Sequence, residues 1–143
     1  MNPNPPARMD NTQSLTLTNG DIWLATQPAR PGQLAAFDAI GRAPMTVLAV
    51  RSASTLARAV NAALADIVIA RDAALEQHCP IKKQDATGRT SYSVTPEFVA
   101  AEAELMAETI TLQGVRAMKI SEFSQGTFLA REDVELCGPL LID

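Results

Sequence analysis

A long run without glycine or proline constrains this chain more than any other feature. The run occupies residues 45–79 and lies between Pro44 and Pro80. Proline fits the first turn of a helix, where its missing N–H loses no partner, and it disfavours a helical conformation in the residue before it. The sequence therefore predicts one continuous helix over residues 44–78, roughly 50 Å long at about 1.5 Å per residue.

The apolar residues of this run recur with the period of an amphipathic helix. Their positions are Ala53, Leu56, Ala57, Val60, Ala63, Leu64, Ile67, Val68, Ala70, Ala74 and Leu75. Because such a helix is too long to bury its whole stripe within a compact chain of 143 residues, we expect a homo-oligomer, as a coiled coil or bundle. The expected interface consists of Leu56, Val60, Leu64, Ile67, Val68 and Leu75. A helical hairpin within one chain is an equal alternative.

Length and composition bound the fold and disfavour one class of partner. A chain of 143 residues is expected to form one domain, and with 4% aromatic residues its core must be mainly alanine, leucine, isoleucine and valine. The net charge of -4 argues against a nucleic-acid partner, which usually meets a basic surface. Two cysteines, Cys79 and Cys137, predict reduced thiols rather than a disulfide framework.

No motif in the sequence points to catalysis or to a cofactor. The GxSxG, P-loop, GxGxxG, HExxH and zinc-deaminase patterns are missing. The single histidine, His78, stands next to Cys79, but adjacent residues at a helix end rarely converge on one metal ion, and no further group completes a site. We therefore expect a protein that is not an enzyme and that holds neither a metal nor a cofactor.

The N-terminal stretch differs in composition from the rest of the chain. Residues 1–14 are polar and proline-rich, which predicts a flexible arm before a single α+β domain over residues 15–143. This stretch lacks the apolar segment of a secretory signal, and no uninterrupted apolar run reaches the roughly 20 residues of a membrane span. We expect a cytoplasmic protein without a membrane partner.

Shorter elements are predicted before the long helix. Residues 15–17 alternate and favour a strand, and residues 18–21 favour a turn or helix cap. Trp23, the only tryptophan, is expected to anchor the core. Residues 33–40 have apolar positions at helical spacing, and Gly41 is placed to end this short helix as its C′ residue.

The pattern changes after the long helix. Residues 81–94 indicate a β-hairpin with its turn at Gly88. The sequence Thr95-Pro96-Glu97 marks the start of a helix that extends to about residue 108.

The last part of the chain predicts two short strands and a short helix. Residues 109–112 and 115–120 are expected to pair either with each other or with residues 15–17. A short helix is expected over residues 130–136, before an apolar C-terminal segment. The expected fold class is α+β, with a long central helix, shorter helices and a small antiparallel β element.

The predicted hairpin carries the only basic cluster of the chain. For an anionic ligand the expected binding residues are Lys82, Lys83, Arg89 and Tyr92, with Arg51 or Arg58 from the long helix. A hairpin without a ligand is the plainer alternative. For a protein partner the candidate is the exposed part of the apolar stripe over residues 56–75.

Several short motifs follow one another in a defined order. They are Leu17-Thr18-Asn19-Gly20-Asp21-Ile22, Ala43-Pro44-Met45, Ala70-Arg71 with Leu75, Thr95-Pro96-Glu97-Phe98, Leu112, Ile120-Ser121 and Pro139-Leu140-Leu141-Ile142. This order resembles a group of small, uncharacterised proteins encoded by tailed phages and prophages. The long helix here holds more alanine, and less lysine and glutamate, than expected for that group. The resemblance implies a phage context and carries over no catalytic residue.

Two functions of different classes agree with these features. The first is a phage-encoded, non-enzymatic binding protein that acts stoichiometrically on a host component or a small signalling molecule in the host cytoplasm, for example against host defence. Pockets between the subunits of an oligomer would suit such a role. The second is a virion or assembly component, such as a connector, tail chaperone or minor capsid protein.

Overall fold

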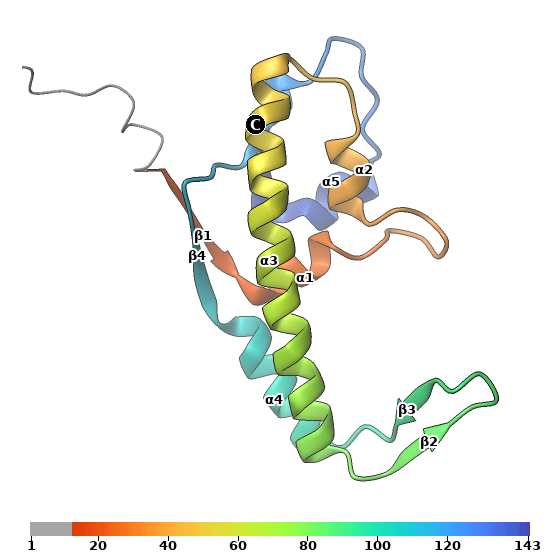
Figure 1. Cartoon of the computed structure of the whole chain (residues 1–143). Coiled ribbons are helices and arrows are strands. Elements are labelled where there is room, and N and C mark those ends of the chain that lie inside the picture. Colours follow the sequence, from red (N-terminus) through yellow and green to blue (C-terminus); the bar gives the residue numbers. More distant parts are fainter. Residues whose placement is uncertain (1–12) are drawn as a thin grey trace, which may run out of the picture.

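The computed structural model describes residues 13–143 and confirms an α+β fold arranged along one long helix (Figure 1). The predicted arm over residues 1–14 falls almost wholly outside the described residues, and its last residue already belongs to a strand. The elements in chain order are β1 (Ser14–Thr18), α1 (Asn19–Ala25), α2 (Ala36–Gly41), α3 (Val47–His78), β2 (Lys82–Gln84), β3 (Thr90–Tyr92), α4 (Pro96–Ala107), β4 (Thr109–Gln113), β5 (Met118–Lys119), η3 (Ile120–Glu122), α5 (Arg131–Cys137), η4 (Gly138–Leu140) and β6 (Leu141–Ile142).

The long helix exists as predicted, but it begins three residues later than Pro44. Its N-cap is Thr46, whose side-chain oxygen accepts a hydrogen bond from the Ala49 N–H at 3.3 Å. The two preceding residues are held by other contacts. The Pro44 carbonyl accepts a hydrogen bond from Ser124, and Met45 forms an antiparallel bridge with Phe123. These tertiary contacts, which sequence propensity does not reveal, delay the start of the helix.

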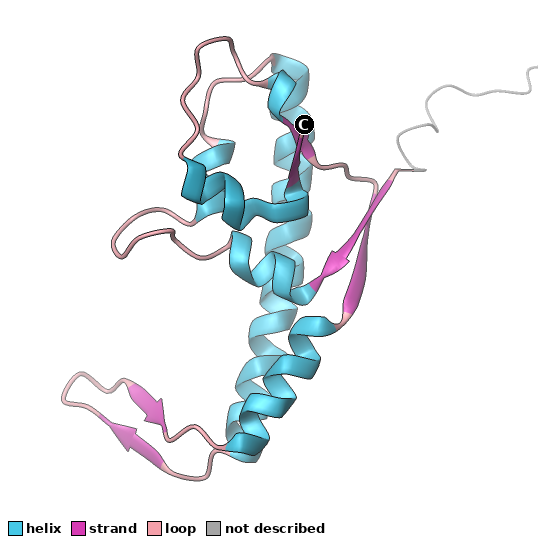
Figure 2. Ribbon diagram, turned by 180° about the vertical axis from the view of Figure 1, so that it is seen from behind, coloured by secondary structure: helices cyan, strands magenta, loops and turns pink. Residues whose placement is uncertain are grey.

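The main core lies against one side of α3. Figures 1 and 2 show the other helices behind or beside α3 and none in front of it in the view of Figure 1. Leu56, Val60 and Ile67 of α3 pack here with side chains from α1, α2, β5 and the C-terminal segment. The largest fully buried partners include Ile22, Ile40 and Leu140. Burying each such side chain contributes about 1.5–3 kcal/mol.

A smaller core holds the C-terminal end of α3 to α4. Its buried members are Leu75, Cys79 and Phe98. The predicted start of α4 is confirmed, because Pro96 is the first helical residue and Thr95 caps the helix. The Thr95 hydroxyl also donates to the His78 carbonyl at 2.7 Å, which ties the start of α4 to the end of α3.

Three two-stranded sheets complete the fold. β1 pairs antiparallel with β4 and β2 pairs antiparallel with β3, as two of the sequence-based pairings proposed. The expectation for residues 115–120 was wrong. Only β5 is a strand there, and it pairs in parallel with β6 at the C-terminus. A strand of two residues is too short to show an alternating apolar pattern, and its distant partner strand cannot be identified from the sequence.

Two further features differ from expectation. Gly41 is the last residue of α2 rather than a left-handed residue after it, since its φ is not positive and Arg42 forms the C-cap. In addition, α3 is long and apolar enough to cross a membrane by the criteria of length and composition. The sequence analysis had found no uninterrupted apolar run of the length that a membrane span needs. Mostly buried core helices of soluble proteins meet the same criteria, whereas 17% of the tested window of α3 is buried. Leu56, Val60 and Ile67 are among its buried residues.

Candidate functional site

The hairpin predicted to bind an anion already binds a carboxylate from α3. Glu76 accepts hydrogen bonds from Lys82 Nζ and from the Tyr92 hydroxyl, both at 2.6 Å. The hydrogen bond from Lys82, with that from Tyr92, lowers the pKa of Glu76. The same carboxylate raises the pKa of Lys82 and the pKa of Tyr92. Glu76 therefore occupies the position that we expected an external anion to take.

The six predicted ligand-binding residues do not form one site. Lys83 and Arg89 are exposed on the hairpin, whereas Arg51 and Arg58 are exposed on the first half of α3. At about 1.5 Å per residue, Arg58 is roughly 27 Å along the helix from Glu76. Arg51 and Arg58 therefore do not join Lys82, Lys83, Arg89 and Tyr92 in one site, and anion binding by the hairpin residues stays a prediction.

The predicted oligomer interface is largely the core of the single chain. Leu56 and Val60 are 0% exposed, and Ile67 and Leu75 are also buried. Leu64 is half-buried against the main core, and only Val68 is an exposed member of the set. The equal alternative, packing within one chain, thus holds for this stripe. A contact between subunits would have to use another surface of the molecule.

A groove lies between α3 and β4 and has a volume of about 580 Å³. Its lining is mostly apolar and comes from α3, the end of α4 and β4. The apolar side chains include Ala59, Ala63, Ile67, Leu105, Ile110 and Leu112. A mainly apolar concavity with a few polar groups is the usual form of a binding site.

The backbone edge of β4 borders this groove. In an antiparallel ladder, the hydrogen-bonded pairs alternate with non-bonded ones. The Glu108 carbonyl and the Gly114 N–H bond to the β1 side, so Ile110 and Leu112 also direct their backbone groups toward β1. The backbone groups of the intervening Thr109, Thr111 and Gln113 face away from β1. Within residues 13–143, no strand pairs with this outer edge.

Two contacts fix the floor of the groove where α1 meets α4. The buried Asn19 donates from its side chain to the Leu105 carbonyl and from its backbone to the Glu108 carbonyl, both at 2.9 Å. Next to it, a Cβ added at Gly20 would lie 3.0 Å from the Met106 carbonyl oxygen, so a larger residue would press against the backbone of α4. These contacts therefore hold the end of α4, which lines the groove, in place against α1.

Acidic side chains give the groove its electrostatic character. Asp66 from α3 and Glu108 at the end of α4 both line it, and no lysine or arginine does. A guest with positive charge is therefore favoured over an anion.

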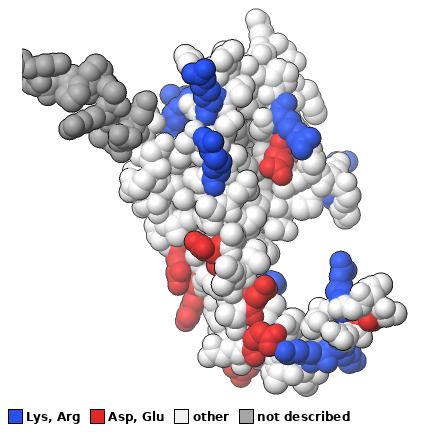
Figure 3. Space-filling model, in the orientation of Figure 1, with Lys and Arg blue, Asp and Glu red and all other residues white. Residues whose placement is uncertain are grey.

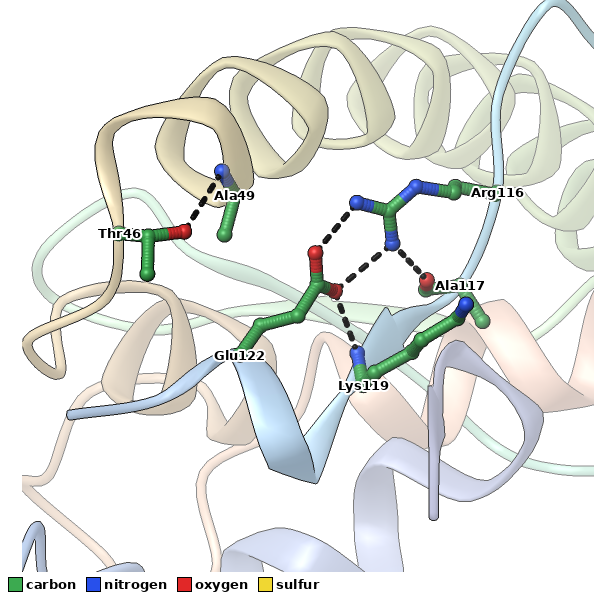
Figure 4. A network of polar contacts seen from close by, with 6 residues as sticks. All are labelled: Thr46, Ala49, Arg116, Ala117, Lys119 and Glu122. Carbon is green, nitrogen blue, oxygen red and sulfur yellow. Dashed lines mark hydrogen bonds and ion pairs between the residues drawn. The ribbon is translucent and has the colours of Figure 1, made fainter. Parts of the chain in front are cut away.

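A second hollow, of about 380 Å³, includes Arg51 and Arg116 in its lining. Arg116 is not available for an anion there, because its guanidinium donates two hydrogen bonds to Glu122, one at 2.7 Å (Figure 4). This pair raises the pKa of Arg116 and lowers the pKa of Glu122. The Glu122 backbone carbonyl in turn accepts from the Thr46 N–H. The pair thus supports the start of α3.

Catalytic groups do not gather within the described residues. Burial raises the pKa of the Cys137 thiol to about 12, which keeps it protonated and unreactive. Cys79 is 0% exposed. Among residues 13–143, no group of three or more His, Cys, Asp or Glu side chains is arranged to hold a metal ion.

The sequence analysis missed the groove as a site. The alternation of Ile110 and Leu112 indicated an apolar strand face, but the groove needs three segments that only the fold brings together. Comparison with protein-family models, curated proteins and solved structures finds no match.

Proposed function

We propose that this chain is a non-enzymatic binding protein that holds an extended segment of a partner protein in the groove between α3 and β4. The observation that supports this function is an edge of β4 along an apolar groove with which no strand of residues 13–143 pairs. An extended peptide adds to such an edge as a further strand, and pockets for alternate side chains provide specificity.

The groove defines the chemistry of the segment. The backbone groups of Thr109, Thr111 and Gln113 would pair with the guest strand at about 4.8 Å. Alternate guest side chains would face the alanines and Ile67 of α3 and are therefore small and apolar. Lysine or arginine in the segment would meet Asp66 and Glu108. The favoured guest is an apolar, basic and extended peptide.

The sequence leads us to expect a phage-encoded protein that acts stoichiometrically on a host component in the host cytoplasm. The present proposal specifies the kind of host component. The host component would be a protein with such a segment, and the acidic groove disfavours a small anionic signalling molecule. A virion or assembly component is the second candidate. It is supported by the exposed apolar residues of α3, such as Ile69, which is 68% exposed.

The test is peptide binding measured by fluorescence anisotropy. Labelled peptides alternating valine with lysine are compared with peptides alternating valine with glutamate, and we expect the basic series to bind at least about tenfold more tightly. Proline has no backbone N–H, so Thr111→Pro should abolish binding. Thr111→Val keeps that N–H and serves as the matched control.

A second pair of variants tests the groove without altering the strand. Ala70 is exposed and lines the groove, so Ala70→Trp should block it. Ala103 is exposed on α4 outside the groove lining, so Ala103→Trp should bind as the unaltered chain does. Equal binding of both peptide series, or unchanged binding by Ala70→Trp, would show that the groove is not the site.

A further inference from the structure

One face of α3 is not covered by another helix of the described chain, although Glu76 near its end accepts hydrogen bonds from Lys82 and Tyr92 of the hairpin. It contains Arg51, Arg58, Ala65, Ile69, Asp72 and Glu76, and we call it the outer face of α3. All six residues are exposed and follow one another at helical spacing. The packed helices lie behind or beside α3 and not over the side turned to the viewer in Figure 1 (Figures 1 and 2). The outer face is therefore open along most of the helix.

Positively and negatively charged residues lie at opposite ends of this face. Arg51 and Arg58 lie in the first half of α3, and Asp72 and Glu76 lie near its end. Between them the face carries small or apolar side chains, among them Ala65 and Ile69. Figure 3 shows basic side chains over the upper part of the helix and acidic ones over the lower part.

The helix dipole does not explain this distribution. It favours acidic residues near the N-terminus of a helix and basic residues near the C-terminus. The first turn of α3 has no acidic residue, and its outer face carries arginines early and carboxylates late. The arrangement is thus slightly unfavourable for an isolated helix. It becomes favourable when a second helix of the same kind runs in the opposite direction.

We infer that two copies of this chain pair through their outer faces, with the two α3 helices antiparallel and the two-fold axis at Ala65. Arg58 and Asp72 lie the same number of residues before and after Ala65, so Arg58 of each copy meets Asp72 of the other. A two-fold contact is closed and self-complementary. A parallel pairing would instead place Arg58 against Arg58 and Asp72 against Asp72.

The centre of the face allows close packing. Ala65 would lie on the axis, with the exposed Ala62 of one copy opposite Val68 of the other. Small side chains let two helices approach to the lower end of the usual spacing of about 8–10 Å. Pairing would also cover Ile69, which is 68% exposed in the single chain. The face therefore combines an apolar centre with complementary charged ends.

This inference does not depend on the proposed function. The groove lies beside the outer face, and Ala62 is at the boundary between the two. Loss of peptide binding would leave the pairing intact, and loss of pairing would leave the edge of β4 intact.

The test is sedimentation equilibrium of the full chain in low salt, with variants that exchange charge. We expect the unaltered chain to have twice the mass of the 15.3 kDa chain. Arg58→Asp and Asp72→Arg each place like charges together and should weaken pairing by about tenfold or more. The double variant restores opposite charges and should restore the dimer. Arg131→Asp changes an exposed arginine on α5 and should have no effect.

Cysteine cross-linking tests the position of the axis. Cys79 and Cys137 are buried, so the thiol introduced by Ala65→Cys is the one exposed thiol within residues 13–143. Mild oxidation should give a covalent dimer with Ala65→Cys and none with Ala103→Cys, since Ala103 lies on α4 away from the axis. A monomer at all concentrations, a dimer insensitive to both charge reversals, or binding of the monomer to lipid vesicles through Ile69 would each overturn the inference.

Discussion

The two halves of α3 have very different surroundings. In the first half, Leu56 and Val60 are enclosed by side chains from β1, α1, α2 and the C-terminal segment. In the second half, beyond Ile67, the helix is covered mainly by α4, and the buried set shrinks to Leu75, Cys79 and Phe98. One continuous helix thus belongs to a large core at one end and to a small core at the other.

The difference separates two sources of stability. The large core joins residues that are far apart in sequence, so it forms only when most of the chain is folded. The small core joins neighbouring segments through a connection that includes the hairpin. Regions with few buried contacts open at a lower free energy than the whole molecule. We therefore expect α4 and the hairpin to open while the large core stays folded.

The largest effect is expected from Leu56→Ala. Leu56 is fully buried, so the truncation removes apolar contacts and leaves a cavity, which should lower the free energy of unfolding by about 2–5 kcal/mol. Urea denaturation followed by circular dichroism measures this loss. Leu48 lies on the same helix and is 74% exposed, so Leu48→Ala should change stability by less than about 0.5 kcal/mol. Similar losses in both variants would contradict the position of the large core.

A smaller and local effect is expected from Phe98→Leu. Phe98 is the aromatic member of the small core, so this change should lower the free energy of opening of α4 by about 1–2 kcal/mol. Hydrogen exchange followed by mass spectrometry should show faster exchange in α4, with unchanged exchange around Leu56. The exposed Val99 provides the control Val99→Ala. An equal increase in both halves would mean that α3 unfolds as one unit.

The smallest effect is expected from Glu122→Gln, at about 1 kcal/mol after allowance for solvent screening. Arg116 holds the pKa of Glu122 below its usual value of 4.5. Its contribution is therefore present above about pH 4.5 and is lost as the pH falls through the lowered pKa. Denaturation curves of the two proteins should differ at neutral pH and converge in acid. Glu76→Gln changes an exposed carboxylate near the end of α3 and should leave whole-chain stability unchanged. A gap that persists in acid would exclude this role for the pair.

Local patterns predicted much of the fold. The start of α4 needs only Thr95 and Pro96, and the hairpin turn needs only a glycine with positive φ at Gly88. The start of α3 was misplaced because Pro44 and Met45 are held by Ser124 and Phe123, which are distant in sequence. Local signals are readable from sequence, but contacts between distant segments are not.

The candidate sites show the same limit more strongly. Apolar periodicity identified which face of α3 is buried, but it did not reveal whether another subunit or this chain covers that face. The groove depends on the edge of β4 that faces away from β1, with which no strand of residues 13–143 pairs, and this is a property of the assembled sheet. Charge along the outer face of α3 was visible in the sequence. A role of these charges in pairing could be inferred only after the structure had shown which faces of α3 are buried.

The position of Arg71 between the large core and the small core has a practical consequence. The Arg71 guanidinium lies 5.3 Å from the ring centroid of Trp23 and 5.5 Å from that of Phe98, and its Nε donates to Glu102 on α4 at 2.6 Å. Trp23 is the only tryptophan in the chain. Release of α4 would free this guanidinium and change the surroundings of the indole ring. The intrinsic fluorescence of the protein is therefore a label-free optical sensor of the attachment of α4, readable on the time scale of a stopped-flow experiment.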